Sequence, residues 1–156
     1  MPIADYILIS PYSKGMRNGA ENPKNYPYWS EVIKLLEGVQ IIQIGVTGEK
    51  SFTGTESVFD KSLAEVTELV RNCKTWAAVD NFLPHLAHLI GKRGVAIFGK
   101  SDPMIFGHPG NINLLKDRKY LRPLQFDIWE RETFDAAAFV GPEIVVKSIM
   151  EVTQNG

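Results

Sequence analysis

The sequence predicts an α/β fold, a three-layer α/β/α sandwich around a mostly parallel sheet of about five strands. Short apolar runs of strand length alternate along the chain with segments of helical spacing. The clearest example is an apolar run at 76–79 that ends in Asp80, followed by a helix start and a second apolar run that ends in Gly99. Strands separated by helices favour parallel pairing with right-handed crossovers. The predicted arrangement is therefore Rossmann-like.

The first half of the chain has clear local patterns. Residues 6–10 form an apolar run closed by Ser-Pro, which indicates a buried strand. Residues 11–27 are rich in Pro, Gly, Asn and Lys without any period, so a long loop is expected. A helix is predicted over 29–36, because apolar residues recur at helical spacing and Gly38 follows. The next strand is predicted at 39–44.

A capping box marks the start of the next helix. Ser62 is the predicted N-cap, Glu65 lies three residues later, and the apolar face runs to about Asn72. The elements that follow are a strand, a helix and a strand, at 76–79, 82–90 and 95–98.

Beyond residue 99 the alternation of strand-length apolar runs with segments of helical spacing weakens. Residues 99–113 are rich in Gly, Pro and Asn and indicate another long loop, and only a short strand is predicted near 114–115. Pro142 stands at the first position of a last helix, which carries an apolar face. No linker or repeat divides the chain, so residues 1–156 are predicted to form a single Rossmann-like domain.

Composition narrows the class of protein. The chain has 156 residues, 44% of them hydrophobic, and a net charge of −1. No cluster of Lys and Arg is long enough to indicate a nucleic-acid surface, and no apolar run is long enough for a membrane span. A single cysteine, Cys73, excludes an intrachain disulfide and fits a reducing compartment. No signal peptide is visible, so a cytoplasmic location is expected.

Polar or glycine residues follow four of the predicted strands, at Ser10, Gly45, Asp80 and Gly99. The carboxyl ends of parallel strands meet at one edge of a sheet. Ligands of open α/β sheets bind beyond that edge, where helix N-termini also point. The sequence therefore predicts a ligand site at this edge, and a nucleotide as its ligand.

Each candidate also has a structural interpretation. Asp80 either faces the ligand or serves as the N-cap of the following helix. His85, one turn into that helix, either donates to phosphate or is a structural histidine. His88 is interpreted as structural, since a metal pair lacks a third ligand at typical spacing. Lys24 either reaches a phosphate or is a solvated loop lysine.

The remaining candidates follow strand ends. Ser10 and Ser13 either bind phosphate oxygens or shape the Ser-Pro turn. Glu49 could accept hydrogen bonds from a ribose or a base, in a glycine turn that is neither a Walker loop nor a dinucleotide fingerprint. Lys100 and Ser101 are either phosphate ligands or an ordinary strand exit.

Five segments resemble, in the same order along the chain, motifs of one enzyme family. Residues 80–87 read Asp-Asn-Phe-Leu-Pro-His-Leu-Ala, which resembles Asp-Ser/Thr-Gly-x-x-His-Leu-Ala. Residues 95–103 read Val-Ala-Ile-Phe-Gly-Lys-Ser-Asp-Pro, which resembles Val-Ala-Leu-Phe-Gly-x-Thr-Asp-Pro. Supporting matches lie at 24–29 (Lys-x-Trp-Pro), 48–49 (Gly-Gly-x-x-Glu) and 62–66 (Ser-Leu-x-Glu-Leu). The chain is thus similar, over about residues 6–110, to the C-terminal half of glycosyltransferase family 9, the heptosyltransferase-like enzymes.

The resemblance implies half of a GT-B fold that binds a nucleotide-sugar, typically ADP-heptose or a related nucleotide diphosphate, with no metal or other cofactor. It places Ser10, Ser13 and Lys24 at the diphosphate or sugar and Glu49 at the nucleoside. It assigns Asp80 to the sugar hydroxyls. The helix start, with Asn81, Phe82 and His85, is assigned to the diphosphate. Phe82 departs from the motif, which has Gly at that position.

The family's acceptor half, which carries the general base, has no counterpart in these 156 residues. The expected function is therefore nucleotide-sugar binding, with glycosyl transfer only when a partner supplies the acceptor half. That partner is either a separate acceptor-domain protein or a second copy of the chain. The other hypothesis is a non-catalytic protein that sequesters or senses an ADP-ribose-like or ADP-sugar-like ligand.

Overall fold

The computed structural model describes residues 5–155. Within them, six parallel strands form one sheet in the order β3-β2-β1-β4-β5-β6. The strands are β1 (Tyr6–Ser10), β2 (Gln40–Gly45), β3 (Glu56–Phe59), β4 (Thr75–Val79), β5 (Val95–Phe98) and β6 (Ile112–Leu115). The α-helices are α1 (Trp29–Leu35), α2 (Leu63–Asn72), α3 (Phe82–Ile90), α4 (Pro103–Phe106) and α5 (Pro142–Asn155). Short 3-10 helices are η1 (Arg118–Tyr120), η2 (Trp129–Arg131) and η3 (Ala136–Ala138).

The predicted α/β/α fold is confirmed, with one strand more than expected. β3 is the strand that the sequence did not indicate, because it is four residues long, lies at the sheet edge and has two exposed residues. The short α4 was also not predicted, and the strand expected near 114–115 extends over all of β6. The predicted capping box is confirmed at the start of α2.

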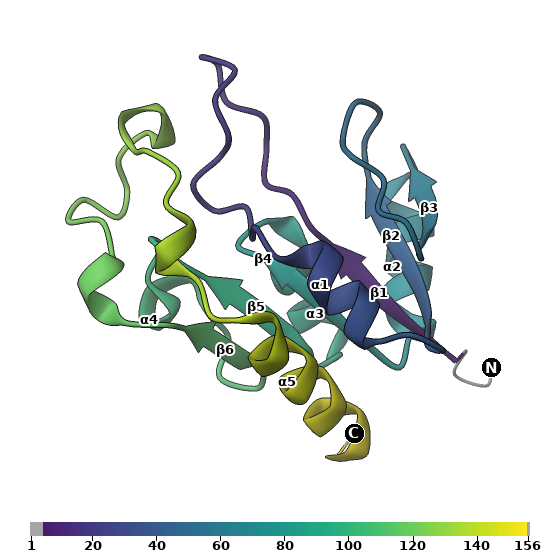
Figure 1. Cartoon of the computed structure of the whole chain (residues 1–156). Helices are drawn as coiled ribbons and strands as arrows, with labels where there is room; N and C mark the ends of the chain where they lie inside the picture. Colours follow the sequence, from purple (N-terminus) through teal and green to yellow (C-terminus); the bar gives the residue numbers. More distant parts are fainter. Residues whose placement is uncertain (1–4, 156) are drawn as a thin grey trace.

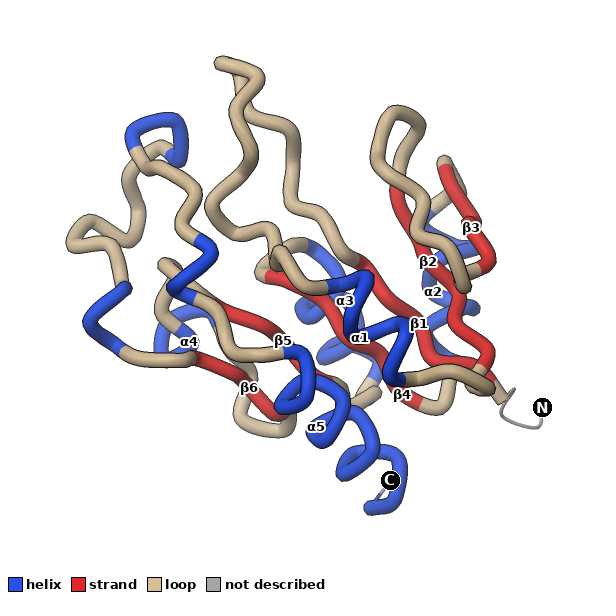
Figure 2. Tube along the Cα trace, in the orientation of Figure 1, coloured by secondary structure: helices blue, strands red, loops and turns tan. Residues whose placement is uncertain are grey.

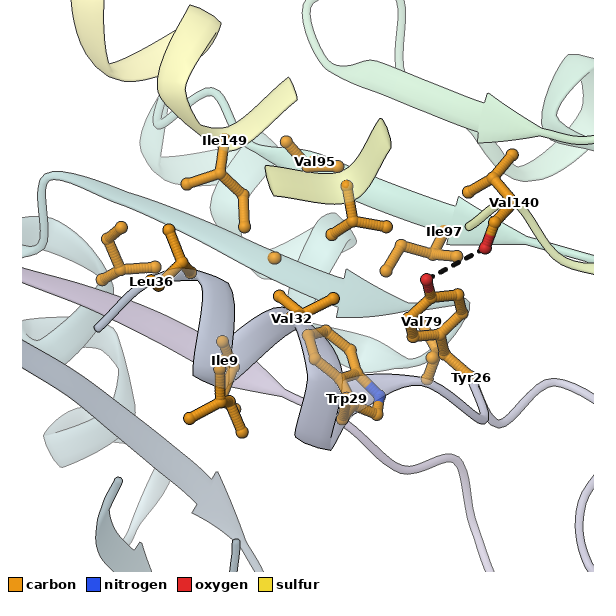
Figure 3. Packing of buried hydrophobic residues seen from close by; sticks show 14 of the residues in the cluster. Ile9, Tyr26, Trp29, Val32, Leu36, Val79, Val95, Ile97, Val140 and Ile149 are labelled. Carbon is orange, nitrogen blue, oxygen red and sulfur yellow. Dashed lines mark hydrogen bonds between the residues drawn. The ribbon is translucent and has the colours of Figure 1, made fainter. Parts of the chain in front are cut away.

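Helices α1 and α5 cover one face of the sheet (Figure 1). Ile97 of β5 belongs to this core together with Trp29 of α1 and Ile149 of α5 (Figure 3). The hydroxyl of Tyr26, which precedes α1, donates to the carbonyl of Val140 at 2.9 Å. Figure 3 marks this bond with a dashed line. This bond ties the loop after β1 to the segment that enters α5.

Helices α2 and α3 cover the opposite face, which completes the three layers. Leu8 of β1 and Trp76 of β4 are fully buried there with Val70 of α2 and Leu83 of α3. Gly94 lies directly against the indole of Trp76, so any side chain at residue 94 would collide with that ring.

The strand order reverses at β1. The chain builds β2 and β3 on one side of β1 and then crosses to build β4, β5 and β6 on the other. Long loops rise beyond the ends of β1 and β2 on the same side of the molecule (Figure 2). In doubly wound sheets the crevice at such a reversal, outside the carboxyl ends of the strands, is where ligands bind.

Candidate functional site

A cavity of about 630 Å³ lies at this reversal, and it is called the switch-point cavity below. Of the four strand-end residues predicted to meet at this edge, Ser10, Gly45 and Asp80 line the cavity, and Gly99 does not. Its lining includes seven of the predicted residues: Ser10, Ser13, Lys24, Glu49, Asp80, Asn81 and Phe82. The other charged lining residues are Lys14, Asp60 and Lys61.

Asn81, not Asp80, is the N-cap of α3. Its side-chain oxygen accepts from the Leu83 N–H at 2.9 Å. Its amide nitrogen donates to the Ser10 hydroxyl at 2.9 Å and to the Tyr12 carbonyl at 3.1 Å. Asn81 therefore fixes both the helix start and the end of β1, and the Asp80 carboxylate does not serve as the cap.

The Asp80 carboxylate instead faces Lys24. The two charged groups are 3.9 Å apart, and their side chains are only 11% and 21% exposed. The Lys24 ammonium also lies 5.3 Å from the ring centroid of Trp129. The Ser13 hydroxyl donates to the Asp80 carbonyl at 2.9 Å, and Asn25 holds the Ser13 N–H. Lys24 is thus a positioned cation within the cavity wall rather than a freely solvated lysine.

Two carboxylates lie at the other end of the cavity. Glu49 accepts from the Val46 N–H at 2.9 Å, and burial, together with the nearby Asp60 charge, holds the pKa of Glu49 above its usual value. Asp60 accepts from the Thr47 N–H at 2.9 Å and from the Thr47 hydroxyl, and these bonds lower the pKa of Asp60. Gly45 lies against Glu49 so closely that a side chain at residue 45 would displace its carboxylate.

A second hollow of about 400 Å³ adjoins the first and is called the aromatic hollow. The two share one wall, formed by Lys24, Asp80, Asn81 and Phe82. Phe82 is the first residue of α3, is 51% exposed and lines both hollows. The remaining wall of the aromatic hollow is formed by His85, Phe106, Arg122, Gln125, Phe126, Asp127 and Trp129.

Most of that wall was not predicted from the sequence. It is organised by Arg122, which is 4% exposed and donates to the carbonyls of Gln125, Asp127 and Ile128. Its guanidinium carbon lies 3.5 Å from the centroid of the Trp129 ring, and burial lowers the pKa of Arg122. A single arginine in a segment without periodicity gives no signal of this role, so only the structure reveals it.

Three predicted residues lie outside the switch-point cavity. His85 lines the aromatic hollow, and its Nδ1 is 2.9 Å from Nε2 of His108, on which His88 stacks. Lys100 donates to the Thr133 carbonyl at 2.5 Å, and Ser101 is buried at 1% exposure. Lys100 and Ser101 line neither hollow.

No group of three or more His, Cys, Asp or Glu side chains is arranged to hold a metal ion within residues 5–155. No helix there has the length and apolar character to cross a membrane.

Solved structures show where this fold occurs. The chain aligns with the glycosyl transferase family 9 protein of Veillonella parvula DSM 2008 at a TM-score of 0.72 and 14% identity, over 97% of this chain and 47% of that one. It aligns with the ADP-heptose lipopolysaccharide heptosyltransferase II of E. coli at 0.70 and 16%, over 99% and 47%. The alignment with E. coli heptosyltransferase WaaC, solved with ADP, gives 0.68 and 18%, over 95% and 44%.

These alignments confirm the resemblance at the level of fold. The chain has a glycosyltransferase-like α/β architecture and spans less than half the length of each of the three enzymes. No protein-family model matches the sequence, and a search of curated proteins gave no match.

Proposed function

We propose that the chain binds a nucleotide-sugar, with the nucleoside diphosphate in the switch-point cavity. The observation that carries this proposal is the position of the cavity at the strand-order reversal, with a fixed cation, a helix start and strand-end carboxylates around it. That combination suits a ligand with an anionic middle and hydroxyl groups beside it.

The phosphate groups are assigned to the side of the cavity near β1 and α3. Lys24 and Lys14 both line it and supply positive charge. Phe82 is the first residue of α3, so the positive end of the helix dipole lies at the same place. Lys24 already sits beside the Asp80 carboxylate, and a diphosphate would give it a second, stronger anionic partner.

The nucleoside is assigned to the side near β2 and β3. An acidic residue after the second strand of such a sheet accepts hydrogen bonds from ribose hydroxyls. Glu49 occupies that place here, and Asp60 lies directly after β3. Adenine is the proposed base, because the structurally similar WaaC was solved with ADP and with ADP-2-deoxy-2-fluoro heptose.

Glycosyl transfer is proposed to need an acceptor half, supplied by another chain or by further sequence of the same polypeptide. Transfer requires a base beside the acceptor hydroxyl and a cleft that orients both substrates. The carboxylates of the switch-point cavity already have partners. Glu49 accepts from the Val46 N–H, Asp60 accepts from the Thr47 N–H, and Asp80 faces the Lys24 ammonium. We therefore assign them to ligand binding and not to proton abstraction.

The test is titration calorimetry of the purified chain with ADP, ADP-glucose and ADP-heptose, with UDP and GDP as competitors for the base assignment. Saturable binding of the adenine compounds supports the proposal, and the absence of heat with every nucleotide would refute it. Mass spectrometry of small molecules released on denaturation checks the same point without a chosen ligand. Multiple-turnover sugar transfer by the chain alone would contradict the assigned need for an acceptor half.

A further inference from the structure

We infer that Trp129 is a positioning residue for phosphate binding, because its ring holds the Lys24 ammonium at the wall of the switch-point cavity. The inference rests on the proposed function, since it explains how the cation assigned to the diphosphate is kept in place. Trp129 lies beyond residues 6–110, over which the sequence resembles the family, so no motif assigns it a role.

The first support is the pair of contacts that orient the Lys24 ammonium. The ammonium lies 5.3 Å from the centroid of the Trp129 ring, within the distance of about 6 Å over which an aromatic face attracts a cation. The Asp80 carboxylate is 3.9 Å away, which is too long for a hydrogen bond. A lysine ammonium carries three N–H donors, and neither contact occupies one of them. Lys24 is therefore held electrostatically while its donors stay available to phosphate oxygens.

The second support is that the Trp129 ring is itself fixed. The guanidinium carbon of the buried Arg122 lies 3.5 Å from the ring centroid. Arg122 also donates to the carbonyls of Gln125, Asp127 and Ile128, which come directly before η2, so these bonds fix the segment that carries Trp129. A cation held by a fixed ring loses less side-chain entropy when a ligand binds, which is the property of a preorganised site.

The third support is a further contact between η2 and the loop that follows β1. Glu130, the residue after Trp129, accepts from the Arg17 N–H at 3.0 Å. This hydrogen bond lowers the pKa of Glu130, and the positive charges of Arg17 and Lys14 lower it further. Lys14 is another cation that lines the switch-point cavity. Two adjacent residues of η2 thus face the loop that carries both cations assigned to the phosphate groups.

The experiment is a double-mutant cycle with two ligands. Trp129→Leu removes the aromatic ring, Lys24→Ala removes the cation, and calorimetry gives the Kd of both single variants and of the double variant. We expect Trp129→Leu to weaken ADP binding by about threefold to tenfold, because Lys24 must then be ordered by the ligand. Binding of adenosine, which has no phosphate, should stay unchanged. In the Lys24→Ala background, Trp129→Leu should not weaken ADP binding further.

Two further variants control for the loss of a ring as such. Trp129→Phe keeps an aromatic face and is expected to retain most of the affinity for ADP. Tyr120→Leu is the matched control, because the Tyr120 ring lies 5.2 Å from the Lys119 ammonium in the same region and neither residue lines the switch-point cavity. This variant loses a cation–π contact of similar length, and its Kd for ADP should equal that of the unaltered chain.

The outcomes separate this inference from the proposed function. If the unaltered chain binds no ADP, the proposed function fails and this inference fails with it. If the chain binds ADP, but Trp129→Leu leaves that Kd unchanged, only the positioning role is wrong. An equal loss for ADP and adenosine, or a loss of ADP affinity that persists in the Lys24→Ala background, would show a general disturbance of the fold and would also overturn the positioning role.

NMR of the chain without ligand tests the contact directly. The ring current of an aromatic face shifts the protons of a methylene group above it upfield. The ε-methylene protons of Lys24 are therefore expected upfield of their position in a flexible lysine, and Trp129→Leu should return them to it. The signal is assigned by its absence from Lys24→Ala. Identical Lys24 signals in the unaltered chain and in Trp129→Leu would overturn the inference.

Discussion

Residues 6–98 and residues 99–141 of the same domain are held together by different interactions. The first region consists of strands and helices joined by apolar contacts across both faces of the sheet. The second contains only α4, β6 and three 3-10 helices, and its segments are fixed by side chains that bind backbone groups. Arg122 and Gln125 are the main examples. The Asp102–Arg118 ion pair at 2.8 Å adds a contact between two side chains.

The difference explains how the two hollows are built. The switch-point cavity is a consequence of topology, because three strand ends must meet at one edge. The aromatic hollow depends on an irregular segment, whose shape requires a few buried polar groups to keep their partners. Variants that affect one region should therefore leave the other largely intact, and the following predictions test that separation.

The largest change in free energy is expected from Arg122→Met, which should destabilise residues 99–141. The change keeps an unbranched side chain but removes the donors to three backbone carbonyls and the contact with Trp129. We expect a loss of roughly 2–4 kcal/mol in the free energy of unfolding of the region 99–141. Native-state hydrogen exchange should show faster opening there, with β1 and β4 still protected.

Arg131→Met is the matched control. Arg131 has a 68% exposed side chain and pairs with Asp127 at 3.2 Å on the surface of the same region. Surface ion pairs contribute roughly 0–1 kcal/mol, so little change is expected. Equal destabilisation by both variants, or uniform opening of the whole sheet in Arg122→Met, would show that the two regions are not separable.

Lys24→Ala is expected to act on binding and not on folding. Loss of one charge-assisted contact to phosphate should weaken ADP binding by roughly 1.5–3 kcal/mol in calorimetry. The melting temperature without ligand should change little, because the pair with Asp80 is long at 3.9 Å. Lys147→Ala, an exposed lysine on α5, is the control. If Lys24→Ala lowers the melting temperature strongly and leaves ADP affinity intact, Lys24 is a structural residue.

Asn81→Ala should affect both a helix and a strand end within the regular region. The substitution removes the cap of α3 and the donor to Ser10 and Tyr12. A cost of roughly 1–2 kcal/mol in urea unfolding is expected. Asn81→Asp keeps an acceptor for the Leu83 N–H but has no amide donor, so it should recover only part of the loss. Full recovery by Asp would show that the bonds to β1 contribute nothing.

The sequence was sufficient for the fold and for one side of the site. Period and capping residues predicted α2, β4, α3 and β5, and parallel topology then placed Ser10, Glu49 and Asp80 at one cavity. Spacing could not distinguish Asp80 from Asn81 as the cap, because both residues can accept from a helix N–H. The wall around Arg122 was not predictable, because side-chain bonds to backbone carbonyls in an irregular segment leave no periodic pattern.

The smallest effect is expected from Glu49→Gln, and it depends on pH. Burial raises the pKa of Glu49 in the folded chain, so the folded state holds its proton at pH values where the unfolded chain has lost it. The contribution of Glu49 to the free energy of unfolding is therefore fully present below the ordinary pKa of the group, and it is lost as the pH rises through the raised pKa of the folded state.

The Glu49→Gln variant keeps the acceptor for the Val46 N–H at 2.9 Å but carries no charge. The variant should therefore match the unaltered chain at pH 4 and be slightly more stable at pH 7, by less than the change for Asn81→Ala. Thermal melting across this range is the measurement, and lower stability of the variant at pH 7 would show that the ionised carboxylate stabilises the fold. Nucleotide affinity should fall in the same variant, since an amide is a weaker acceptor for ribose hydroxyls than a carboxylate.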